Sequence, residues 1–240
     1  MNSIFNRQGG WRLFRKQAPV TFYILIANTA FFLFTIVTQG SDTILGYFDF
    51  FMYGFHPLHL VDMGAIVPSL VLDGGEYWRI FTAAFLHADF LHFLGNMIIG
   101  VLTMGSALEK LVGSKKFSII YFSSLILAGL AVVLFSSLNI PTIGASGAIF
   151  GVLGSLLFIT LYRKDLIPQE RDMQTIWALS AMNIIFTFLS SGVSVPGHLG
   201  GIVSGYLISF FIIKHNSDQQ TIKEEYIDPF QDDDEDYWAH

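Results

Sequence analysis

Six apolar segments, each about as long as a bilayer-crossing helix, limit what this chain can fold into more than any other feature. The sequence has 240 residues, of which 52% are hydrophobic and only 13% are charged, whereas soluble domains carry about 25% charged residues. A membrane-spanning helix needs roughly 17–25 predominantly apolar residues. The predicted spans cover residues 20–38, 91–109, 117–137, 146–162, 173–190 and 197–213. The pattern predicts an all-α membrane protein with a six-helix bundle.

The basic residues alternate between the connections and set the orientation. Four connections are rich in Arg and Lys, and the other three hold Arg79 as their one basic residue. The basic set is Arg7, Arg12, Arg15, Lys16, Lys110, Lys115, Lys116, Arg163, Lys164, Arg171 and Lys214. Because positive charge accumulates on the cytoplasmic side, both chain ends are expected in the cytoplasm.

Composition divides the chain into three parts. Residues 1–19 form a basic cytoplasmic tail, residues 20–214 the transmembrane domain, and residues 215–240 an acidic tail expected to be solvated and disordered. The first span is not preceded by a small-residue cleavage site, so we do not expect it to be a removed signal peptide.

The absence of cysteine excludes thiol nucleophiles and disulfides. No basic patch suggests nucleic-acid binding, and no cofactor is expected.

The first connection, residues 39–90, is unusually long and is not an ordinary polar loop. It contains apolar or aromatic runs at residues 48–55 and 58–61, interspersed with carboxylates. This amphipathic pattern predicts short helices that lie in the outer membrane interface. A plain solvated loop is the alternative.

Two Gly-rich strings open the fourth and sixth spans: Gly144-Ala145-Ser146-Gly147 and Gly197-His198-Leu199-Gly200-Gly201. Ser146 precedes Arg163 by 17 residues and His198 precedes Lys214 by 16, which places them about 25 and 24 Å from the cytoplasmic ends of their helices. A serine and a histidine at one depth are the two parts of a hydrolase dyad.

Each of these residues also has a plainer interpretation. Ser146 alone could be a helix N-cap, and His198 alone could be an interfacial histidine. Together, at one depth and beside small residues that let helices approach closely, they favour a dyad.

Two further groups share that layer. His92 and Asn96 are four residues apart, so they lie on one helix face, and both can donate hydrogen bonds to an oxyanion. Mutual hydrogen bonding is the alternative. Glu109, at the opposite end of the second span, is either an interfacial residue beside Lys110 or the anchor of a buried hydrogen-bond network.

Residues 20–213 resemble the rhomboid intramembrane serine proteases in their minimal six-helix form, with a long, partly membrane-embedded first loop. The resemblance rests on five motifs taken together. They are Trp78-Arg79, His92-x-x-x-Asn96, Gly105-x-x-x-Glu109-x-x-x-Gly113, Gly144-Ala145-Ser146-Gly147 and Gly197-His198-Leu199-Gly200-Gly201.

The resemblance implies a role for each site residue. Ser146 is the nucleophile and His198 the general base, while Asn96, His92 and the Ser146 backbone N–H form the oxyanion hole. The supporting residues are Phe150, which stacks on the histidine, His87, Trp78, Arg79, Glu109, Gly144, Gly147, Gly197 and Gly201. No metal ligand set is expected.

The function implied is that of a serine endopeptidase which cleaves transmembrane segments of other proteins near the outer face of the bilayer. The expected location is a bacterial plasma membrane, with the site open to the extracytoplasmic side. Two alternatives stay open: a catalytically silent membrane chaperone or trafficking protein on the same scaffold, and a transporter, although no inverted repeat is visible. The natural substrate and the oligomeric state are not predicted.

Overall fold

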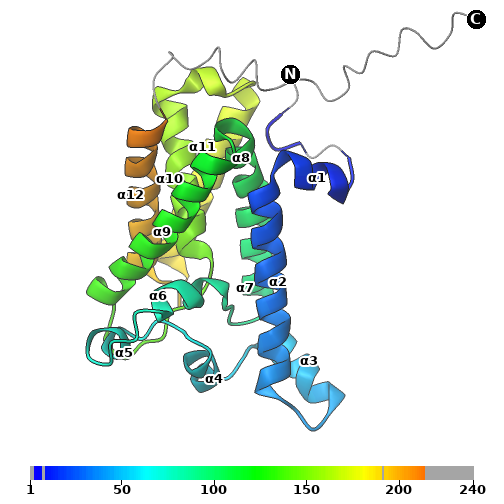
Figure 1. The fold of residues 1–240 in the computed structure, drawn as a ribbon, viewed down its shortest axis with the longest axis vertical. Coiled ribbons are helices and arrows are strands. Elements are labelled where there is room, and N and C mark those ends of the chain that lie inside the picture. The colour runs from blue at the N-terminus through cyan, green and yellow to red at the C-terminus, as the bar shows by residue number, and fades with distance from the viewer. Residues whose placement is uncertain (1–2, 7–8, 191, 214–240) are drawn as a thin grey trace, which may run out of the picture.

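The structure is a computed structural model that describes residues 3–6, 9–190 and 192–213, and every regular element in this part of the chain is helical. Arg7, Lys214 and the predicted acidic tail, residues 215–240, lie outside the described residues. The elements are α1 (Trp11–Gln17), α2 (Pro19–Gln39), α3 (Ile44–Tyr53), α4 (Pro57–Asp62), α5 (Pro68–Leu72), α6 (Arg79–Thr82), η1 (Ala83–Phe85), α7 (Phe90–Gly95), η2 (Asn96–Gly105), α8 (Ser106–Val112), α9 (Ser114–Phe135), α10 (Ser146–Tyr162), η3 (Lys164–Leu166), α11 (Glu170–Leu189) and α12 (Val195–Ile212), shown in Figure 1.

The long helices coincide with the six predicted spans. Within the described ranges, four helical stretches are long and apolar enough to cross a bilayer: Pro19–Gln39, Phe90–Val112, Ser114–Phe135 and Val195–Ile212. Helix α10 is apolar but shorter, with 17 residues, and α11 has 20. The prediction of an all-α membrane bundle is therefore confirmed.

The second span is one continuous rod of three helical segments, α-helical at both ends and π-helical between them. It begins as the α-helix α7, widens into the π-helix η2 over Asn96–Gly105, and returns to α-helical form in α8. The wide turns have a side-chain counterpart, because the Thr103 hydroxyl donates to the carbonyl of Ile98, five residues earlier. π-Helical stretches are rare and often mark functional sites.

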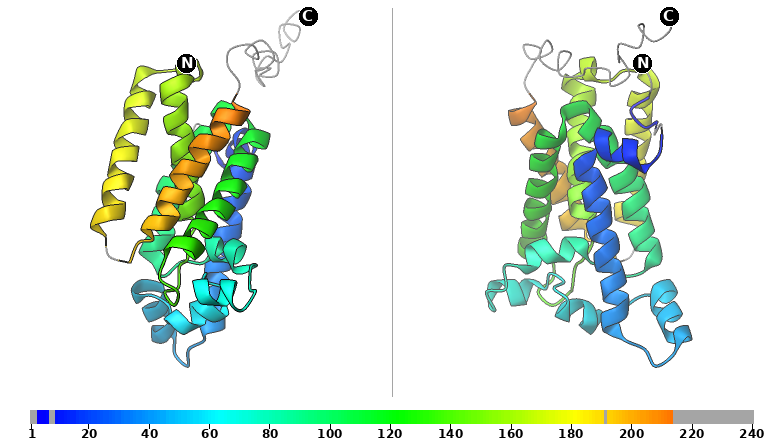
Figure 2. Two further views of the ribbon diagram at one scale, coloured as in Figure 1. Left: turned by 90° about the vertical axis from the view of Figure 1, so that its left-hand side faces the viewer. Right: turned by 45° about the vertical axis from the view of Figure 1, so that its right-hand side comes forward.

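Helix α10 is the centre of the bundle, and α9 and α12 pack against it and against each other (Figure 2). Small residues make this close packing possible, because a Cβ on Gly205 or on Gly201 would overlap the backbone of α10 at Gly151 or Gly147. Deeper along the same seam, the Ser155 hydroxyl donates to the Gly205 carbonyl at 3.1 Å. The two helices therefore run almost backbone to backbone.

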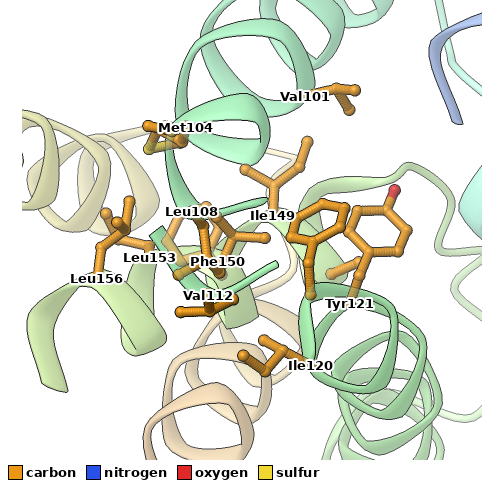
Figure 3. Close-up of a cluster of buried hydrophobic side chains, with 14 of the residues drawn as sticks. Val101, Met104, Leu108, Val112, Ile120, Tyr121, Ile149, Phe150, Leu153 and Leu156 are labelled. Carbon is orange, nitrogen blue, oxygen red and sulfur yellow. The ribbon is translucent and has the colours of Figure 1, made fainter. Parts of the chain in front are cut away.

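On its other side α10 packs against the second span through a hydrophobic core. Figure 3 shows the side chains of η2, α8, α9 and α10 meeting there. Met104, Leu108 and Leu153 are each fully buried in this core. This packing fixes the height of α10, and hence of its first residue, relative to the second span.

Glu109 lies on α8 and is buried, with 1% of its surface exposed. Its carboxylate accepts from the backbone N–H groups of Val20 and Thr21, at 3.0 and 2.8 Å, and from the hydroxyls of Thr21 and Ser114, at 2.7 Å each. The two N–H groups belong to the first turn of α2, where donors have no partner inside the helix. Of the two interpretations of Glu109, the buried network is the one that the structure contains.

The first loop folds into the short helices α3 to α6 and gathers at one end of the bundle, opposite α1 (Figure 1). Arg79 holds it together: one guanidinium nitrogen donates to the carbonyls of Val61 and Ala65, at 2.6 and 3.1 Å, and the side chain pairs with Glu76. The guanidinium also lies 4.6 Å from the ring centre of Trp78. The expected short helices are present, and their membrane depth remains a prediction.

At the opposite end, the start of the chain is tied to α11. The Asp172 carboxylate, 1% exposed, accepts from the Ser3 hydroxyl at 2.5 Å and from the Ile4 N–H at 3.2 Å. The ammonium of Lys110 donates to the carbonyls of Ile4 and Asn6. The predicted basic tail therefore includes ordered contacts with both α8 and α11.

Candidate active site

Ser146 is the first residue of α10, directly after a turn that only glycine adopts easily. Gly144 has φ +114°, a left-handed conformation that side chains disfavour, and its N–H donates to the Ala83 carbonyl at 2.8 Å. Two residues earlier, Thr142 exchanges a pair of backbone hydrogen bonds with Ile66 of the first loop. The loop thus fixes the chain just before Ser146. The N-cap residue of α10 is Ala145, so Ser146 is not the N-cap.

His198 lies in the first turn of α12. The helix begins after Ser194, whose hydroxyl caps it by accepting from the Gly197 N–H at 3.2 Å, and Pro196 in the first turn favours the helical start. This geometry aims the imidazole, which is only 5% exposed, at α10. Its Nε2 lies 2.9 Å from the Ser146 Oγ, within hydrogen-bond distance.

Two groups hold the imidazole from its other sides. Phe150, one helical turn after Ser146, stacks on His198 with ring centres 3.8 Å apart and planes inclined by 16°. Thr187, in the last turn of α11, places its Oγ1 2.8 Å from the Nδ1 of His198. The ring is therefore contacted from α10 on one face and from α11 on the Nδ1 edge.

The two predicted oxyanion donors lie beside Gly144. A Cβ at Gly144 would be 2.9 Å from the Nε2 of His92 and 3.7 Å from the Nδ2 of Asn96. The Ala88 N–H donates to the Nδ1 of His92 at 3.4 Å, so in neutral His92 the proton is on Nε2. The Nδ2 of Asn96 is buried without a hydrogen-bond partner in the described part of the chain. The alternative interpretation was a hydrogen bond between His92 and Asn96, and the described part of the chain contains no such bond.

His87 lies behind His92, with 1% of its surface exposed. Its ring meets His92 and Phe93 edge to face, with ring centres 5.2 and 5.4 Å apart. Burial, with a smaller contribution from His92, lowers the pKa of His87 to about 3. His87 is therefore neutral at physiological pH and fills the space against which His92 packs.

The remaining supporting residues fall into two groups. Gly147, Gly197 and Gly201 border the dyad, and a Cβ at Gly147 would approach Ala128 of α9 to 2.7 Å. The other group is remote, because Trp78 and Arg79 belong to the first-loop scaffold and Glu109 to the α2–α8 contact described above. The structure gives this second group hydrogen bonds and stacking that hold helices in place.

A cavity of about 40 Å³ adjoins Ser146 and His198. Its walls come from the first loop, α9 and the starts of α10 and α12, and many of them are small residues such as Ala83, Ala128 and Gly129. A space of this size accommodates two or three water molecules or one small side chain.

One residue of this site is absent from the sequence-based predictions. Thr187 lies 11 residues before His198, in the apolar stretch Phe186-Thr187-Phe188, and belongs to none of the motifs. A single hydroxyl inside an apolar helix end was the signal that could have identified it, since polar side chains in such positions usually have a partner.

Comparison with known proteins gives the family. Residues 74–215 match the sequence profile of the Rhomboid domain. The chain is 30% identical over 216 residues to "Putative rhomboid protease YdcA" of Bacillus subtilis (strain 168), covering 88% of this chain and 97% of that protein. It is also 30% identical over 194 residues to rhomboid protease GluP of the same organism, covering 81% of this chain and 35% of GluP.

A plant protein is also similar to the chain. RHOMBOID-like protein 1 of Arabidopsis thaliana is 35% identical over 159 residues, covering 65% of this chain and 40% of that protein. The chain thus spans nearly all of the first relative and about a third of GluP. With its apolar helices, the chain is an integral membrane protein, and it belongs to the rhomboid family of membrane proteases.

Proposed function

We propose that this protein is an intramembrane serine endopeptidase that uses Ser146 and His198 as its catalytic dyad. One observation carries the proposal: the 2.9 Å contact between the Nε2 of His198 and the Oγ of Ser146, made between two helices that are held backbone to backbone. Neither side chain is long, so the contact exists only because α10 and α12 approach so closely. The family membership supports a protease in general, and this geometry supports the serine chemistry.

The dyad would act in two halves. In the first, the Nε2 of His198 takes the hydroxyl proton of Ser146 while the Oγ attacks the carbonyl carbon of the scissile peptide bond. His198 then gives that proton to the departing amine, leaving an acyl-enzyme ester on Ser146. In the second half, water loses a proton to His198, attacks the ester and releases the carboxylic product, and the proton returns to Ser146.

The negative oxygen of each tetrahedral intermediate needs donors that are already in place. The Nε2–H of His92, the Nδ2–H of Asn96 and the backbone N–H of Ser146 are the proposed set. Asn96 supports this role best, because a buried amide donor without a partner is costly unless a substrate oxygen completes it. The adjoining cavity of about 40 Å³ would take a small side chain of the substrate or the hydrolytic water.

The proposed substrates are transmembrane segments of other membrane proteins, unwound locally so that the peptide carbonyl is accessible. The site lies at the first-loop end of the bundle, and the basic connections lie at the other end (Figure 1). With the positive-inside orientation, the site opens to the extracytoplasmic side and both termini are cytoplasmic. The two Bacillus relatives support a bacterial plasma membrane as the location.

The decisive experiment compares the wild type with Ser146→Ala and His198→Ala in detergent and in liposomes. The probe substrate is a fusion protein with one apolar helix that carries small residues near its outer end. Both variants should lose cleavage, and a fluorophosphonate should label Ser146 only when His198 is intact. Ser118→Ala is the matched control and should cleave normally, because the Ser118 hydroxyl on α9 donates to the Ser114 carbonyl of its own helix.

Retained cleavage in Ser146→Ala would overturn the dyad. If the wild type binds the fusion protein without cleaving it, over a range of pH and lipid, the catalytically silent chaperone replaces the protease.

A further inference from the structure

The contact between Thr187 and His198 joins two helices and lies on the side of the imidazole that faces away from Ser146. Thr187 is on α11, His198 on α12, and their exposed fractions are 2% and 5%. A hydrogen bond shielded from water in this way is not exchanged readily for one to solvent. The state of the ring therefore depends on what the Thr187 hydroxyl can offer it.

The hydroxyl has one proton and two short contacts. Its Oγ1 lies 2.8 Å from the Asn183 carbonyl oxygen, one turn earlier on α11, and 2.8 Å from the Nδ1 of His198. A carbonyl oxygen can only accept, so the contact with Asn183 needs the hydroxyl proton. If that proton pointed at Nδ1 instead, two oxygens would face each other at 2.8 Å with no hydrogen between them.

With His198 neutral, only one arrangement places a proton in every contact. The Thr187 hydroxyl donates to Asn183, its remaining lone pair accepts from the Nδ1–H of His198, and the Nε2 of His198 is left with a lone pair. That lone pair faces the Ser146 hydroxyl at 2.9 Å. A general base needs this tautomer, because only an unprotonated Nε2 can accept the proton of Ser146.

We propose that Thr187 is a positioning residue that fixes His198 as its Nδ1–H tautomer and so makes Nε2 the base. In effect a neutral hydroxyl on a third helix occupies the place that an acidic side chain has in a catalytic triad. This role rests on the proposed function, because the Nδ1–H tautomer matters only if His198 accepts the proton of Ser146.

The same contact favours the transition state over the ground state. When His198 accepts the proton of Ser146 it becomes an imidazolium, and its Nδ1–H then donates to Thr187 as a charged group. Charge-assisted hydrogen bonds are roughly twice as strong as neutral ones. Removal of the hydroxyl should therefore lower kcat more than it raises KM.

The kinetic test uses Thr187→Val, which keeps the side-chain shape and removes the hydroxyl, beside Thr187→Ser, which keeps it. On the same fusion substrate, kcat of Thr187→Val should fall about tenfold to a hundredfold with KM within about twofold. Thr187→Ser should stay within about threefold of the wild type. Thr175→Val is the matched control on α11, because the Thr175 hydroxyl also donates to a carbonyl one turn earlier, that of Arg171. The Thr175→Val protein should cleave normally.

The spectroscopic test does not depend on activity. In ¹⁵N-histidine-labelled protein, the ring nitrogens of His198, assigned by difference from His198→Gln, should report a proton on Nδ1 in the wild type and a mixture of tautomers in Thr187→Val. A wild-type spectrum with the proton on Nε2, or a folded Thr187→Val with wild-type kcat, would overturn the proposal. If Ser146→Ala still cleaves, the dyad fails instead, and the tautomer is still decided by the spectrum.

Discussion

The imidazole of His198 is held on three sides by groups from different positions in the sequence. Phe150 stacks on its face, Thr187 meets Nδ1, and Ser146 meets Nε2. A face-to-face contact at 3.8 Å prevents the ring from rotating about its Cβ–Cγ bond without displacing Phe150. The ring is therefore oriented before any substrate arrives, which lowers the cost of reaching the reactive geometry.

At the same scale, His87 makes stability depend on pH. Its pKa is lowered to about 3 in the folded state from the ordinary value of 6.5, so between these values the unfolded chain binds a proton that the folded chain does not. Stability from this residue is complete above pH 6.5 and is lost progressively as the pH falls toward 3. From pH 7 to pH 5 the contribution to the loss is ~2 kcal/mol.

His87→Phe, which keeps an aromatic ring and removes the titration, should flatten this part of the pH dependence. The measurement is the free energy of unfolding in detergent at pH 7 and pH 5 for both proteins. Equal slopes for the wild type and the variant would contradict the assignment.

Much at the residue scale could be predicted from sequence, and Thr187 is the exception. Ser146, His198, His92 and Asn96 could be placed in one layer, because helical rise converts their spacing from basic residues into depth. Thr187 carries a weaker signal, because a hydroxyl in an apolar helix end is expected to have a partner, but the sequence does not tell whether that partner is its own helix backbone or also a second helix.

At the scale of elements, α10 and α12 are the pair on which the site depends. A Cβ at Gly205 would overlap the Gly151 backbone, and a rigid backbone cannot move aside as a flexible side chain can. Gly205→Ala should therefore lower the free energy of unfolding by about 3 kcal/mol and push apart the starts of both helices, with loss of cleavage.

The matched control is Gly95→Ala, since a Cβ at helical Gly95 would meet no neighbouring atom within 4 Å. This variant should be unchanged or more stable by up to ~1 kcal/mol, because alanine favours helices. Denaturant titrations in detergent compare the two, and equal stabilities of the two variants would refute the packing argument.

The helices themselves were predictable from hydropathy, whereas their interruptions were not. Within the π-helical part of the second span, Gly100 lies against Ile149 of α10, so close that a Cβ at Gly100 would overlap the Ile149 side chain, and these residues are far apart in the chain. The fold of the first loop depends likewise on Arg79, whose guanidinium reaches carbonyls 14 and 18 residues earlier. An amphipathic pattern predicts short helices, but it does not predict to which backbone carbonyls an arginine side chain will donate hydrogen bonds.

For the whole molecule, the orientation in the membrane is directly testable, because the chain has no cysteine of its own. Leu58→Cys, at an exposed site of the first loop, should react with a membrane-impermeant maleimide in intact cells. Lys164→Cys, exposed on the opposite end of the bundle, should react only after permeabilisation. The reverse labelling pattern would mean that the opposite membrane orientation is correct and that the dyad lies near the cytoplasmic side.

The bond between Asp172 and the first residues of the chain has a practical consequence for recombinant production. Trimming the chain to begin after Asn6 removes two donors to a carboxylate that is 1% exposed, together with two acceptors for the Lys110 ammonium. A buried carboxylate stripped of donors is costly, and here that cost would fall on α11, the helix that also carries Thr187. Purification handles and fluorescent fusions are therefore better added at the carboxyl end, which leaves the hydrogen bonds of Ser3, Ile4 and Asn6 intact.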